Sequence, residues 1–308
     1  MSTPSRSAPA PGPYARPLGP VAAAGWSAAF LIVFAMAMSV LGAVRPNAQP
    51  DDVSAALLDA ASVLGIVYAI ARVHAPETNT LALIGVRPLG VLPGLISAVM
   101  GACAVVPFGA LQALISRRFP LTDERSEEIT HMLASQGRAE RIAGIVALVV
   151  VMPIADELFF RGALATGVAR HKGRLVALIT TALAFSLVYA AVFDPHYLPL
   201  YVALGVMCGV ARLTTGSVVA AILAHLGWRA ADLVRDLRVT GTIDPLVTST
   251  YPYPAYSVQV VAGATAATLA LALLLTRTSR APGDDRAEAR PGDAPKPPPV
   301  DRDPEDDA

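Results

Sequence analysis

The stretch ADELFFRGAL, residues 155–164, places three ionisable side chains directly after the apolar run IVALVVVMPI, residues 145–154. Glu157 and Arg161 are four residues apart, so on a helix they lie on one face and can form an ion pair. Asp156 projects about 100° away from that face and is left without this partner. A buried acid beside an ion pair is suited to act as a general base. Alternatively, all three side chains extend from the helix end into lipid headgroups.

A second polar set lies in VVAAILAHLGWRAADLV, residues 218–234. His225 is followed by Arg229 and Asp232, at spacings of four and seven residues that keep all three on one helix face. Charged groups in a bilayer are costly and turn towards the protein interior or a water-filled cavity. We therefore expect this face and the acidic motif to meet, although a histidine in a membrane helix also commonly bonds a neighbouring carbonyl.

The composition predicts the membrane scaffold that these side chains need. Of the 308 residues, 54% are hydrophobic and 16% are charged, and the mean hydropathy is +0.52. A soluble domain averages about 25% charged residues. About 20 apolar residues cross a bilayer as a helix. The predicted fold class is therefore all-α, a polytopic membrane protein with about eight transmembrane helices, placed near 24–44, 54–73, 89–115, 141–161, 174–193, 197–214, 217–235 and 258–277.

Several details of these helices follow from single residues. Pro153 should kink or break the fourth helix, because proline has no N–H to donate. The short segment TTGS, residues 214–217, separates the sixth helix from the seventh only weakly. Charged residues with apolar positions at helical spacing predict an amphipathic interfacial helix over 122–141.

Two Pro-rich tails flank this transmembrane helical domain, which we place at residues 21–279. Residues 1–20 contain mostly Pro, Ala and Ser, and residues 280–308 carry nine acidic and five basic side chains. Such segments cannot bury enough apolar surface to fold, so both are predicted to be disordered.

Arginine and lysine placement favours an N-in, C-in orientation in a plasma membrane. The loop after the fourth helix carries Arg170, Lys172 and Arg174, whereas the segment 117–141 fits this rule poorly because its five arginines would lie outside. The many alanines and arginines indicate a bacterium with a GC-rich genome.

Composition also limits the partners and cofactors. The formal net charge is zero, which gives no indication of a nucleic-acid partner. Cys103 and Cys208 both lie in apolar runs, and the absence of a CxxC or Cys/His cluster argues against structural zinc. We expect both cysteines to be packed as small buried hydrophobes.

At this point a family resemblance becomes visible. DELFFRG, residues 156–162, resembles the EExxxR motif of the CPBP family, which includes the type II CAAX prenyl proteases and the bacteriocin-processing or immunity proteins. The later family motifs FxxxH and HxxxN correspond to FSLVY, residues 185–189, and HLGWR, residues 225–229. The resemblance covers a core of about residues 140–235 and suits the eight-helix prediction.

The resemblance implies roles for the motif residues. Asp156 would be the base that activates water, Glu157 and Arg161 the structural pair, and the third motif would supply oxyanion donors from His225 and Arg229. Three family positions differ, because the family has Glu, His and Asn where this chain has Asp156, Tyr189 and Arg229. A phenol has an ordinary pKa of about 10, so tyrosine cannot accept a proton at neutral pH, but it can hold a water or a carboxylate.

The resemblance predicts an intramembrane endopeptidase that hydrolyses a peptide bond of a membrane-associated substrate. One alternative is a pseudoprotease that binds a membrane partner or peptide without cutting it, because three motif positions depart from the family. A less favoured alternative is a small ion- or proton-coupled carrier. The expected partners are a peptide or protein substrate and the lipid bilayer. We expect no cofactor, and a metal ion stays an open alternative, although a catalytic zinc needs about three protein ligands.

Overall fold

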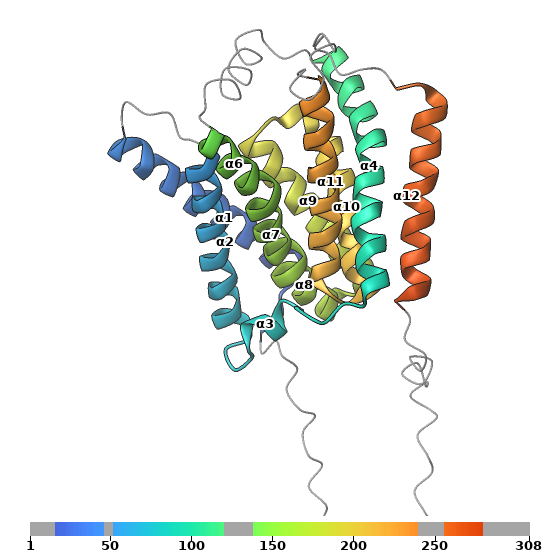
Figure 1. Cartoon of the computed structure of the whole chain (residues 1–308). Helices are drawn as coiled ribbons and strands as arrows, with labels where there is room; N and C mark the ends of the chain where they lie inside the picture. Colours follow the sequence, from blue (N-terminus) through green and yellow to red (C-terminus); the bar gives the residue numbers. More distant parts are fainter. Residues whose placement is uncertain (1–15, 46–51, 120–137, 240–255, 280–308) are drawn as a thin grey trace, which may run out of the picture.

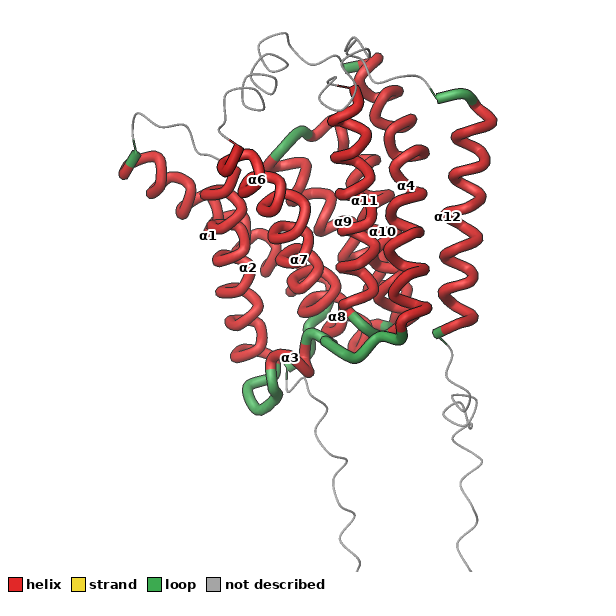
Figure 2. The backbone as a smooth tube through the Cα atoms, viewed as in Figure 1, coloured by secondary structure: helices red, strands yellow, loops and turns green. Residues whose placement is uncertain are grey.

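The computed structural model describes residues 16–45, 52–119, 138–239 and 256–279 (Figure 1). Within these residues every regular element is a helix. Most of the long helices lie side by side in one bundle (Figure 2). The all-α class is therefore confirmed. In chain order the elements are α1 (Pro20–Val44), α2 (Asp52–His74), α3 (Thr80–Leu83), α4 (Val91–Arg118), α6 (Arg138–Val146), η1 (Ala147–Val151), α7 (Met152–Glu157), η2 (Leu158–Leu164), α8 (Ala165–Lys172), α9 (Arg174–Val192), η3 (Pro195–Tyr197), α10 (Leu198–Thr215), α11 (Val218–Val239) and α12 (Val258–Thr278).

The described residues contain seven helical stretches that are long and apolar enough to cross a membrane. The seventh of the eight predicted crossings, α11, is 22 residues long but is not among these stretches, because Arg229, Asp232 and Arg235 interrupt its apolar residues. The described chain nevertheless begins and ends on the same side of the bundle (Figure 1). This arrangement needs an even number of crossings. We therefore count α11, which is more polar than the seven apolar stretches, as a crossing too, which gives eight.

The fourth apolar segment is longer than predicted. We expected a helix that ends near residue 161 and is kinked or broken at Pro153, but the helical stretch continues from Ile142 to Lys172. Two π-helical segments, η1 and η2, widen its turns. η1 ends two residues before Pro153, and the change of hydrogen-bond register accommodates a residue that has no N–H. η2 contains Arg161, and π-helical turns within α-helices frequently occur at functional sites.

Glycines allow the closest approaches between helices. Gly101 in α4 and Gly227 in α11 lie where these two helices touch, and a β-carbon at Gly227 would overlap the carbonyl oxygen of Ala98. Gly205 in α10 faces α9, where an added β-carbon would lie 3.0 Å from the α-carbon of Ala182. Small residues let membrane helices pack at short range, and these contacts hold α4, α9, α10 and α11 together.

The predicted boundary between the sixth and seventh helices is confirmed. Helix α10 ends at Thr215, and Gly216 then adopts a left-handed conformation with φ of 71°, which favours glycine. Most of the predicted amphipathic segment 122–141 lies outside the described residues, as do 1–15 and 280–308 of the predicted tails. Just before α1, Leu18 is buried and the Arg16 N–H donates to the carbonyl of His74 at 3.1 Å.

Candidate active site

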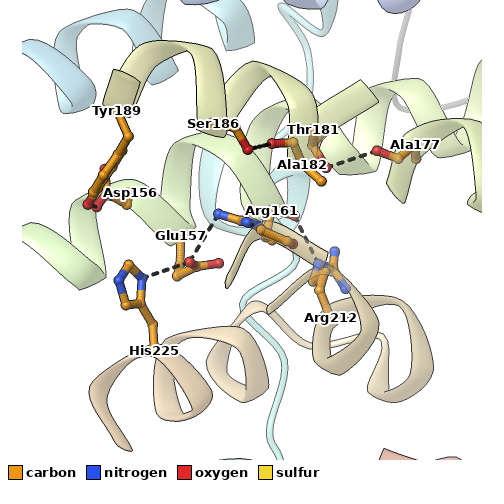
Figure 3. Close-up of polar contacts among 11 residues, drawn as sticks. Asp156, Glu157, Arg161, Ala177, Thr181, Ala182, Ser186, Tyr189, Arg212 and His225 are labelled. Atoms are coloured by element: carbon orange, nitrogen blue, oxygen red, sulfur yellow. Dashed lines mark hydrogen bonds and ion pairs between the residues drawn. The ribbon is translucent and has the colours of Figure 1, made fainter. Parts of the chain in front are cut away.

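The acidic motif lies at the junction of α7 and η2, in the interior of the bundle (Figure 3). Asp156 is 3% exposed, and Glu157 and Arg161 are fully buried. Arg161 donates from Nη1 to Glu157 Oε1 at 3.1 Å and from Nη2 to the carbonyl of Gly205 at 2.9 Å. The ion pair predicted from the four-residue spacing is therefore formed. The alternative in which these side chains reach the headgroups is wrong, because other helices cover them.

Helix α11 approaches the same motif through His225. The His225 ring is fully buried, and its Nδ1 donates to Glu157 Oε1 at 2.9 Å. One carboxylate oxygen of Glu157 thus accepts from both His225 and Arg161 (Figure 3). The polar faces of the two helices meet, as predicted, and Nε2 of His225 has no hydrogen-bond partner among the described residues.

Phe185, the apolar member of the second motif, links the two halves of the site. The Arg161 guanidinium carbon lies 4.6 Å from the centre of the Phe185 ring, a cation–π distance. The same ring lies 4.3 Å from the Tyr189 ring and 6.1 Å from the His225 ring, centre to centre. These rings thus pack beside the Arg161 guanidinium, whose Nε has no hydrogen-bond partner among the described residues.

Asp156 points away from the ion pair and towards α9 (Figure 3). The Tyr189 hydroxyl donates a hydrogen bond to Asp156 Oδ2. Both side chains line a cavity of about 280 Å³ that also contains Phe30 and Phe34 from α1. Asp156 is therefore the acid of the motif that faces the cavity, whereas Glu157 does not line it.

Three other polar residues of the sequence prediction take different positions. His225 contacts Glu157 and does not line the cavity that holds Asp156. Arg229 interacts electrostatically with Asp156 and Tyr189, but it forms no ion pair with Asp156 in the described part of the chain. Asp232 pairs with Arg235 at 2.7 Å, so it does not extend the His225 face into the site.

Two buried polar residues were missed by the sequence prediction. Asp59, in the first half of α2, lines the same cavity as Asp156. Arg212, in α10, donates from Nε to the Arg161 carbonyl at 3.1 Å and from Nη2 to Thr166 Oγ1 at 2.9 Å. Asp59 had a sequence signal, because a lone acid within an apolar helix is itself a functional indication. Arg212, near the end of its helix, did not differ from an interfacial arginine.

One group of residues resembles a metal-ligand set. Ligand atoms of Glu157, Cys208 and His225 all lie within 4.8 Å of one another, and all three residues are buried. The Glu157 carboxylate, however, is already neutralised by Arg161 at 3.1 Å. A divalent cation there would be held next to a guanidinium, so these residues fit an ion-pair network better than a metal site. Cys208 is buried as predicted, whereas Cys103 is only partly buried.

Comparison with known proteins supports the motif-based resemblance. Residues 138–231 match the model of one family, described as type II CAAX prenyl endopeptidase Rce1-like. This segment contains all three motifs and confirms the predicted family resemblance. The comparison with curated proteins gives no match, and neither does the comparison with solved structures.

Proposed function

Because residues 138–231 carry the match to the CAAX endopeptidase family, we propose that this protein is an intramembrane endopeptidase that cuts a membrane-associated peptide or protein. One observation carries the proposal. A buried carboxylate, Asp156, and a hydroxyl, Tyr189, face a cavity of about 280 Å³ between apolar helices. A cavity of this kind can hold a water molecule and a peptide carbonyl away from bulk solvent.

The residues divide into a reacting set and a supporting set. Asp156 takes the proton from water as the water oxygen attacks the peptide carbonyl carbon. The Tyr189 hydroxyl holds the Asp156 carboxylate in place, a role that needs no proton transfer by the phenol. Arg229, which interacts with both, supplies positive charge that favours the developing negative charge on the carbonyl oxygen. His225 acts through Glu157, so it is a positioning residue.

Purified protein in lipid vesicles tests this function with quenched-fluorescence peptides, both prenylated and unmodified. We expect cleavage by the wild type and a loss of about 100-fold or more in Asp156→Asn, the range for removal of a general base. Glu77→Gln is the control, because Glu77 is an exposed acid in the loop after α2. Equal rates for wild type and Asp156→Asn would overturn the assignment.

The hydrogen bond from Tyr189 to Asp156 also favours a second function. The hydroxyl occupies an acceptor site that an attacking water would otherwise use, as expected for a pseudoprotease that binds peptides without hydrolysis. That function predicts no turnover by wild type and new turnover when Glu, His and Asn are restored by Asp156→Glu, Tyr189→His and Arg229→Asn together. If neither the wild type nor the triple variant cuts peptides, and the wild type does not bind them, both functions are refuted.

We also propose that the protein lies in a bacterial plasma membrane. The side of the bundle on which the described chain begins and ends would face the cytoplasm. The loop between α8 and α9, the start of α1 and the end of α12 lie on one side of the bundle (Figure 1). Arg170, Lys172 and Arg174 are exposed on that side, and such residues favour the cytoplasmic face. To test this orientation, single cysteines are introduced at exposed loop positions of a variant that lacks Cys103 and Cys208. Their reaction with a membrane-impermeant thiol reagent shows which loops lie on each side of the membrane.

A further inference from the structure

The buried acid in the first half of α2 has no evident structural task. Asp59 is 5% exposed, and its Oδ2 has no hydrogen-bond partner among the described residues. Between Asp52 and Arg72, Asp59 is the only Asp, Glu, Lys or Arg in the sequence of this apolar helix. An unpaired acid in a membrane-embedded helix is costly, and such residues usually face a functional cavity.

The surroundings of Asp59 contain few other polar groups. In the cavity that it lines, α1 and η1 contribute apolar side chains, among them Phe30, Phe34 and Leu148. The titratable groups that share the cavity are Asp156 from α7 and Tyr189 from α9. Asp59 and Asp156 also interact electrostatically. Two carboxyls therefore face one apolar space, and Arg229 of α11 and Arg161 of η2 are the cations that act electrostatically on Asp156.

Two like charges in one apolar cavity repel each other, so such a pair retains one proton in common. The Tyr189 hydrogen bond favours the charged form on Asp156, since a donor stabilises a carboxylate. Asp59 receives no such bond at Oδ2 and is the better site for the proton. The cavity thus offers a carboxylate and a carboxylic acid side by side.

We propose that Asp59 is a second catalytic residue, the general acid that works with Asp156 on the peptide bond. This inference rests on the proposed peptidase function. It also accounts for the missing histidine at position 189, because a pair of carboxyls can move both protons without an imidazole.

The reaction balances with water as the only co-reactant. In the first step the water oxygen bonds to the peptide carbonyl carbon, Asp156 accepts the water proton, and Asp59 gives its proton to the carbonyl oxygen. The product of this step is a gem-diol. In the second step Asp59 takes a proton back from one hydroxyl, and Asp156 gives its proton to the peptide nitrogen as the C–N bond breaks. A carboxylic acid and an amine leave, and both aspartates return to their starting forms.

The test compares kcat/KM as a function of pH for wild type, Asp59→Asn and Asp156→Asn in lipid vesicles. Asn keeps the shape of Asp but cannot donate the acid proton. We expect a bell-shaped profile for wild type. In Asp59→Asn we expect kcat/KM to fall by about 100-fold or more, and the decrease at high pH, which reports deprotonation of the general acid, to disappear. A structural role for Asp59 would lower the yield of folded protein but leave this profile unchanged. Asp194→Asn is the control, because Asp194 caps η3 at the end of the bundle.

Infrared titration of the wild type gives a measurement that does not need the variant to fold. We expect a protonated-carboxyl band at neutral pH that disappears when the cavity pair loses its proton. Absence of that band, or an Asp59→Asn rate within threefold of a cleaving wild type, would overturn this inference alone. Absence of cleavage by wild type on all peptides would overturn the proposed peptidase function, and the inference with it.

Discussion

Replacement of Arg161 by Met tests whether the buried ion pair holds the site together. Met has a similar length but no charge. The variant loses the Nη1 bond to Glu157 at 3.1 Å, the Nη2 bond to the Gly205 carbonyl at 2.9 Å and the cation–π contact with Phe185 at 4.6 Å. The Glu157 carboxylate would then be fully buried with His225 as its remaining described partner.

The expected cost follows from the loss of the guanidinium that neutralises this buried carboxylate. Removal of one partner of a buried ion pair destabilises a protein by about 3–5 kcal/mol. A domain has about 5–15 kcal/mol of stability in total, so Arg161→Met should remove a large share of it. The double variant Glu157→Gln/Arg161→Met removes both charges of this ion pair. We expect it to be more stable than Arg161→Met alone, with a coupling of about 0.5–3 kcal/mol between the two positions.

Equilibrium unfolding in mixed micelles, followed by circular dichroism and tryptophan fluorescence, measures these free energies. Trp228 is 6% exposed and its ring centre lies 5.9 Å from that of His225, so its emission reports on the site. Arg174→Met is the matched control, because Arg174 is exposed at the start of α9 and should change stability by about 0.5 kcal/mol or less. A loss below about 1 kcal/mol for Arg161→Met, or strict additivity in the double variant, would refute the reasoning.

Three further outcomes are expected. Tyr189→Phe removes the donor to Asp156, and because a hydrogen bond to a charged group contributes about 1.5–3 kcal/mol, peptide cleavage should fall about tenfold to a hundredfold; an unchanged rate would contradict a positioning role. Gly227→Val should destabilise the protein by about 1–3 kcal/mol in the same unfolding assay, because its side chain would overlap the Ala98 carbonyl, whereas Gly25→Val, with open space around it, should have little effect. Treatment with a chelator should leave cleavage unchanged, because Arg161 already neutralises Glu157; a loss that zinc restores would show that the metal interpretation is correct.

Much of the scaffold could be predicted from the sequence because its signals are local. A run of about 20 apolar residues is enough to indicate a crossing, and seven of the eight predicted crossings are apolar spans in the structure. The prediction was wrong at the fourth helix, which we expected to end near residue 161, at the charges of the motif. In the structure the helix continues to Lys172 because the neighbouring helices, rather than lipid, surround those charges.

Within the site, local spacing was sufficient to predict the pairing of residues that are close together along the chain. Glu157 and Arg161 pair because a four-residue spacing puts them on one helix face. The sequence also determined that the polar faces of the fourth and seventh predicted helices turn inward. It could not determine which group on one helix meets which group on another. That depends on the rotation and depth of helices that meet only in the folded bundle.

The different partners of the two acids of the motif depend on contacts between helices that are distant along the chain. Asp156 accepts a hydrogen bond from Tyr189, which lies 33 residues further along the chain. Glu157 accepts one from His225, which lies 68 residues further along. Asp59 reaches the cavity of Asp156 from α2, which lies outside the segment that matches the family. The physical reason is that burial requires polar groups to face inward but leaves their partners to helix packing, which small residues such as Gly205 and Gly227 set by allowing backbones to touch.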